Sequence, residues 1–143
     1  MNIVGSSVSF TVGIVIGVIA NRALESAKEN KVIDKEKLLE ESFGEHVYAS
    51  KFSLSQAKDW IKVRKDSIDN GSKALILKLT SKILKDLSVE AEISDDAENY
   101  IVIAIVETTS GEVEDTLLVK YDELDEKLEE LLIKGDGSLV VGS

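Results

Sequence analysis

The run YIVIAIV, residues 100–106, is apolar at every position. Side chains of a strand alternate between its two faces, so a strand that is apolar throughout is predicted to be covered on both faces. We therefore expect a buried central strand here. The residues TSGE at 109–112 predict a turn, and Val113–Tyr121 is expected to return as the hairpin partner. The sequence thus predicts a sheet built around this hairpin.

Shorter strands are expected elsewhere in the chain. In Ala74–Leu79 the leucines fall on alternate positions, which places them on one face of a strand. In Val89–Ile93 apolar residues alternate with glutamates, which is typical of a half-exposed strand. Weaker strand patterns lie at 47–52 and 139–141. Together with the hairpin, these segments predict a small, largely antiparallel sheet.

Two helices are expected to pack on this sheet. Ser53 and Gln56 form a capping-box pattern, which predicts a helix over residues 54–69. Asp122 is a candidate N-cap for a second helix over residues 123–134, where leucines recur at helical spacing. The predicted fold class is therefore α+β: an N-terminal hydrophobic helix, then a small, largely antiparallel sheet with two main packing helices.

The N-terminal segment, residues 3–20, contains no charged residue. As a helix it would be about 27 Å long, close to the roughly 30 Å hydrocarbon core of a bilayer. Gly5, Ser9, Gly13 and Gly17 recur every four positions and therefore share one helix face, where the lack of bulk lets a second helix approach closely. We predict that these four residues mediate helix packing and oligomerisation. A cleaved signal peptide, a buried helix of a soluble domain and a strand are the alternatives.

These patterns divide the chain into three parts. Residues 1–21 are predicted to form a membrane-spanning or assembly-core helix, residues 22–45 a helical connector, and residues 46–143 an α+β globular domain. Asp34 is expected to cap a helix over residues 35–42 in the connector. A short helix is also expected over 82–87.

The charges around the hydrophobic segment predict an orientation for a spanning helix. Lysine and arginine are absent before the segment and frequent after it. The positive-inside rule then places the N-terminus outside and the C-terminal domain in the cytoplasm. In the alternative localisation the chain belongs to an extracellular or cytoplasmic filament whose hydrophobic helices pack in the interior.

The composition excludes several classes of function. The chain has no Cys and a single His, His46, so it has neither thiolate nor multi-histidine metal sites. Its net charge of -10 disfavours nucleic-acid binding. We find no catalytic, cofactor-binding or metal-binding candidate and no specific small-molecule ligand.

The charge is divided unevenly along the chain. Residues 22–85 carry 14 basic and 10 acidic side chains, and residues 86–143 carry 3 basic and 17 acidic ones. In one interpretation the two halves interleave in one fold, so that their charges partly cancel. In the other, a basic face and an acidic face meet between subunits. The helix residues that would contribute intersubunit contacts or contacts with lipid headgroups are Lys58, Lys62, Arg64 and Lys65.

The sequence thus predicts a non-enzymatic, self-assembling structural protein that forms homo-oligomers through the Gly/Ser face of its N-terminal helix. The protein would be either membrane-anchored, with lipid as a partner, or a filament or tube subunit. One alternative is a membrane-disrupting, pore-forming effector. Another is a membrane-tethered ligand-binding or enzymatic domain.

Overall fold

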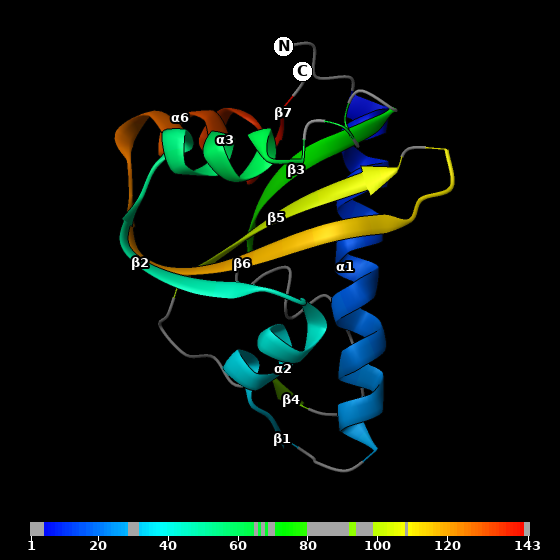
Figure 1. The fold of residues 1–143 in the computed structure, drawn as a ribbon. Helices are drawn as coiled ribbons and strands as arrows, with labels where there is room; N and C mark the ends of the chain where they lie inside the picture. Colours follow the sequence, from blue (N-terminus) through cyan, green and yellow to red (C-terminus); the bar gives the residue numbers. More distant parts are fainter. Residues whose placement is uncertain are drawn as a thin grey trace.

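A computed structural model describes residues 5–28, 32–64, 66, 68, 71–79, 92–93, 99–107 and 109–141; for residues 5–11, 26, 32–33 and 92–93 it describes the backbone alone. Helices and strands alternate along most of this chain (Figure 1). In chain order they are α1 (Gly5–Ala27), β1 (Val32–Ile33), α2 (Lys35–Ser42), β2 (His46–Phe52), α3 (Leu54–Lys62), β3 (Ser72–Leu79), β4 (Glu92–Ile93), β5 (Asn99–Glu107), β6 (Val113–Leu124), α6 (Glu126–Lys134) and β7 (Ser138–Val141).

The main sheet has five strands in the order β2-β6-β5-β3-β7. The pairs β6-β5, β5-β3 and β3-β7 are antiparallel, whereas β2 runs parallel to β6. The α+β class is confirmed, and the predicted hairpin of β5 and β6 lies in the middle of the sheet. Three of the four pairs are thus antiparallel, and the parallel edge strand β2 makes the sheet mixed. A smaller parallel pair joins β1 to β4.

Helices cover both faces of the sheet, which gives three layers (Figure 1). Alternate residues of β5 point to opposite layers: Val102 and Ala104 pack in a core with α1 and α2, and Ile101 and Ile103 pack in a second core with α3 and α6. All of residues 101–106 are fully buried. The predicted buried central strand is therefore confirmed.

One face of α1 is part of the first core. Val15, Ile19 and Ala23 recur every four residues and are each 0% exposed. They lie in one cluster with Leu38 and Leu39 of α2 and with residues of the sheet. Within the described part of the chain, no helix combines the length and the apolar character needed to cross a membrane.

The predicted helix starts at Asp34 and Ser53 are confirmed. The Asp34 carboxylate accepts a hydrogen bond from the Glu36 amide at 3.0 Å, and Ser53 and Gln56 form the reciprocal capping box at the start of α3. Helix α3 ends at Lys62, earlier than the predicted position 69.

The start of α6 differs from the prediction. Phe52 pairs with Leu124, so β6 continues beyond Tyr121 and the helix begins only at Glu126, with Asp125 as its N-cap. Asp122 is therefore a strand residue, and it accepts a hydrogen bond from the Tyr48 hydroxyl. The helix predicted over 82–87 and the strand residues 89–91 lie outside the described residues.

The burial of α1 can be tested with two substitutions on the same helix. Ile19→Ala removes a fully buried side chain and is expected to lower the free energy of unfolding by about 2–5 kcal/mol. Glu25→Ala is the control, because the Glu25 side chain is 65% exposed and its truncation should change stability by less than about 0.5 kcal/mol. Urea unfolding followed by circular dichroism measures both.

The same packing bears on the division into domains. Deleting residues 1–21 would uncover Leu38, Leu39 and one face of the sheet, so we expect the remaining chain to lose its cooperative unfolding transition. A truncated chain that unfolds cooperatively at the wild-type urea concentration would instead establish α1 as a dispensable appendage.

Candidate functional site

The predicted row of small residues lies on α1. Gly5 and Ser9 belong to its first turns, for which the backbone alone is described. Gly13 is exposed and Gly17 half-buried, and a Cβ added at either one would meet no atom within 4 Å. Positions two apart on a helix lie about 160° apart, so Gly13 and Gly17 point away from buried Val15 and Ile19. The glycines thus face outward from the core.

Two further residues extend this outward face. Ala20 is half-buried, and Leu24 is 53% exposed although it is a large apolar residue. The positions of Gly13, Gly17, Ala20 and Leu24 follow each other by four, three and four residues, which is the spacing of a helix-pairing seam. We call these four residues the outer strip of α1. In Figure 1, α1 crosses the strands of the sheet. Helix geometry places Gly13, Gly17 and Leu24 on the side of α1 that points away from Val15 and Ile19.

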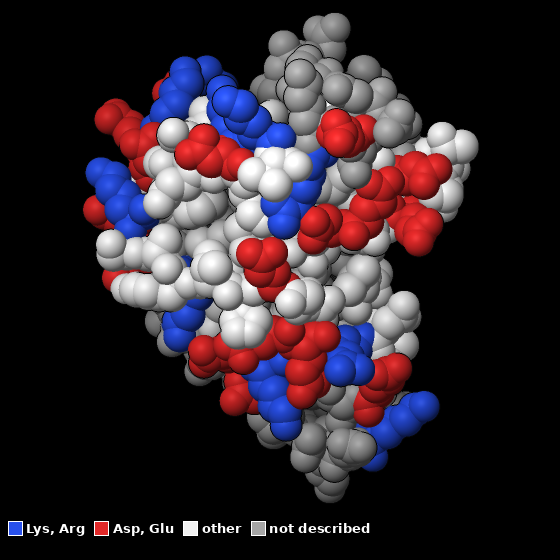
Figure 2. Space-filling view, viewed as in Figure 1, with Lys and Arg blue, Asp and Glu red and all other residues white. Residues whose placement is uncertain are grey.

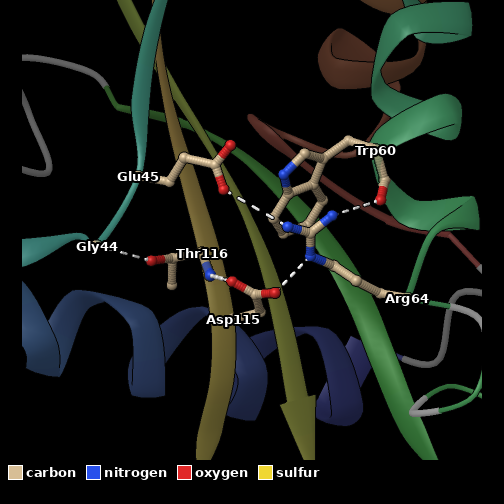
Figure 3. Close-up of polar contacts among 6 residues, drawn as sticks. All are labelled: Gly44, Glu45, Trp60, Arg64, Asp115 and Thr116. Carbon is tan, nitrogen blue, oxygen red and sulfur yellow. Dashed lines mark hydrogen bonds and ion pairs between the residues drawn. The ribbon is translucent and has the colours of Figure 1, made fainter.

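Three of the four predicted basic residues lie among the described residues. Lys58 and Lys62 are exposed on α3, and Lys65 lies outside the described residues. Arg64 instead folds back onto the protein (Figure 3). Its guanidinium group lies 3.6 Å from the centre of the Trp60 ring, and its Nη1 donates a hydrogen bond to the Trp60 carbonyl oxygen at 2.9 Å.

Arg64 also joins segments that are distant in sequence. Its Nε pairs with the Asp115 carboxylate on β6, and its Nη2 lies 3.5 Å from a carboxylate oxygen of Glu45, just before β2. The contact with Asp115 links the basic half of the chain to the acidic half, and Figure 2 shows acidic and basic side chains interspersed on one face of the molecule. Arg64 thus bonds within its own subunit, whereas Lys58 and Lys62 remain exposed.

Replacement of Arg64 should reveal this structural role. Arg64→Met removes the ion pairs and the cation–π contact, and we expect a loss of about 1–3 kcal/mol in the free energy of unfolding together with a change in Trp60 fluorescence. Lys62→Met is the matched control, because Lys62 is an exposed residue of α3. It should change neither the free energy of unfolding nor the Trp60 fluorescence. An effect of Lys62→Met equal to that of Arg64→Met would contradict the assignment.

A cavity of about 320 Å³ lies between α2 and the β2 edge of the sheet. Its floor is a cross-strand row, in which Tyr48 of β2 and Tyr100 of β5 flank Lys120 of β6. Glu36 and Glu40 project from α2 at four-residue spacing, and His46 precedes Tyr48 by two positions on the same face of β2. We call this site the α2–β2 pocket.

The polar groups of the α2–β2 pocket are partly paired with one another. The Lys120 ammonium lies 3.3 Å from a Glu36 carboxylate oxygen. The hydroxyl of Tyr48 donates to the Asp122 carboxylate, and this hydrogen bond raises the pKa of Tyr48. Beneath them the Lys35 ammonium lies 5.7 Å from the centre of the Tyr100 ring. No cluster of His, Asp and Glu suited to hold a metal ion occurs among the described residues.

The sequence patterns alone did not reveal this pocket. His46 has no candidate partner nearby in the sequence, because the residues around it in the pocket come mainly from α2, β5 and β6. Two local patterns pointed toward it: the Glu36/Glu40 spacing on a short helix and the alternation of His46 with Tyr48 on a strand. Comparison of the chain with models of known protein families, with curated proteins and with solved structures found no match.

Tyr121, on the other face of β6, gives a prediction of pH dependence. Its hydroxyl is buried without a hydrogen-bond partner among the described residues, and burial followed by the nearby charge of Glu129 raises the pKa of Tyr121 to about 12. The fold therefore favours the neutral phenol. The raised pKa of Tyr121 should therefore contribute fully to the free energy of unfolding below the ordinary tyrosine pKa of about 10. This contribution should be lost as the pH rises through about 12.

We expect the Tyr121→Phe variant not to lose this part of its unfolding free energy at high pH, because phenylalanine has no group to ionise. Below pH 9 the variant should match the wild type within about 0.5 kcal/mol, since the hydroxyl makes no hydrogen bond among the described residues. Urea unfolding between pH 8 and pH 12 measures the difference. Parallel stability curves for the two proteins over this range would contradict the raised pKa.

Proposed function

We propose that the protein is a non-enzymatic structural protein that self-associates through the outer strip of α1. The observation that carries this proposal is the division of α1 into two faces. Val15, Ile19 and Ala23 are buried in the core, while Gly13 and Gly17 point outward with open space before them. The outer strip therefore remains available to a second copy after the protomer has folded.

The chemistry of the outer strip suits contact between two identical helices. Without side chains at Gly13 and Gly17, two backbones approach more closely than the usual 8–10 Å between helix axes, which increases dispersion contacts. Leu24 adds an exposed apolar side chain whose full burial is worth about 1.5–3 kcal/mol. A strip that pairs with itself produces a closed dimer with two-fold symmetry.

A filament or tube requires a second contact between different surfaces. Exposed Lys58 and Lys62 on α3 supply a basic surface for such a contact, and the acidic C-terminal half of a neighbouring subunit supplies its complement. Gly5 and Ser9 would extend the helix contact toward the N-terminus. Membrane anchoring with the N-terminus outside, and the pore-forming alternative, stay predictions that no contact among the described residues favours.

The proposal is tested by filling the outer strip. In Gly13→Leu/Gly17→Leu, the new side chains meet nothing within the protomer at the Cβ position, so the fold should persist while close helix approach is blocked. Leucine also has a higher helix propensity than glycine, by about 1 kcal/mol, which supports α1 itself. We expect the wild type to sediment as an oligomer and the double variant at the monomer mass of 15.6 kDa.

A control variant separates this effect from added hydrophobicity. Lys58→Leu/Lys62→Leu places two leucines on the exposed side of α3; it removes the proposed basic contact but should leave the dimer formed through the outer strip in place. Analytical ultracentrifugation over a hundredfold concentration range, with circular dichroism to check folding, gives the answer. A wild type that is monomeric throughout, or a folded glycine variant with the wild-type mass, would refute the proposal.

A further inference from the structure

We infer that the α2–β2 pocket binds a small organic cation, namely a primary ammonium or guanidinium group carried on an apolar body. The pocket joins a charged wall from α2 to a floor made by three strands. Its volume, about 320 Å³, is at the lower end of the range for small-ligand sites. This inference uses none of the residues of the outer strip and is independent of the proposed self-association.

The charges around the pocket determine the sign of the charge that a ligand must carry. Glu36 is paired with Lys120, so their charges largely cancel. Glu40 lies exposed on the same face of α2 and has no ion-pair partner among the described residues. Next to the pocket, the Asp122 carboxylate accepts a hydrogen bond from the Tyr48 hydroxyl and has no ion-pair partner among the described residues. The buried Lys35 ammonium offsets part of this charge, and the remaining field is negative.

The apolar surfaces of the pocket determine the body of the ligand. Tyr48 is 61% exposed, which leaves much of its ring available for contact with a bound molecule. The neighbouring Tyr100 ring already lies near the Lys35 ammonium, an arrangement in which the negative face of an aromatic ring attracts a cation. An ammonium group would reach Glu40 while its apolar body covers the Tyr48 ring.

His46 makes this inference directly testable. It is the single histidine of the chain and lines the pocket, so its imidazole NMR signals report on this site alone. The probe is phenethylamine, and 2-phenylethanol is the control, because it has nearly the same shape without the charge. With the full chain at pH 8, we expect a saturable shift of the His46 signals below about 10 mM phenethylamine and none with the alcohol.

Matched variants test the role of the carboxylates. Glu40→Gln should weaken phenethylamine binding by about three- to tenfold, because it removes the unpaired charge. Glu41→Gln makes the same change one position further along α2, outside the pocket lining, and should leave binding unchanged. A capped Gly-Lys-Gly peptide distinguishes the two sources of such a cation. Binding tighter than that of the amine assigns the site to a protein side chain, and weaker binding assigns it to a free amine.

Three results would overturn the inference. The first is the absence of a saturable shift up to about 10 mM phenethylamine. The second is equal binding of phenethylamine and 2-phenylethanol, which would show that the carboxylates do not recognise the charge. The third is tighter binding of phenylacetate than of phenethylamine, which would show that the pocket prefers an anion.

Discussion

The burial of β5 on both faces is the constraint on which the rest of the structure depends. Residues 101–106 are fully buried, and a strand in that position must be covered by helices on each side. The face formed by Val102 and Ala104 is covered by α1 and α2, and the face formed by Ile101 and Ile103 by α3 and α6. Loss of either helix layer would therefore expose the most apolar strand of the protein to water.

The same constraint explains why α1 has two different faces. Val15, Ile19 and Ala23 pack against the sheet, and this contact fixes the rotation of α1 about its own axis. Gly13 and Gly17 must then point outward, where they leave open space. The α2–β2 pocket arises in a related way, because α2 covers the sheet beside its β2 edge and leaves a space between its glutamates and the cross-strand row of tyrosines and lysine.

The sequence was most informative where a structure depends on neighbouring residues. The apolar run at 100–106 predicted two-sided burial, and the Ser53/Gln56 pattern predicted the capping box, because each depends on a few adjacent positions. The parallel pairing of β2 with β6 could not be predicted, since it depends on contacts between distant segments. It also displaced the start of α6, because Phe52 holds Leu124 in the strand. Arg64 and His46 illustrate the same limit, since their partners come from several elements.

The parallel edge strand has a consequence for the order of folding during synthesis. The ribosome releases α1 and β2 well before β6, which must lie beside β2. The sheet face that covers α1 includes residues of β5, β6 and β7, so α1 has no complete site to dock on until β7 has emerged. Val15, Ile19 and Ala23 therefore lack their sheet contacts while the later strands are synthesised, and the core must wait for pairing between distant segments.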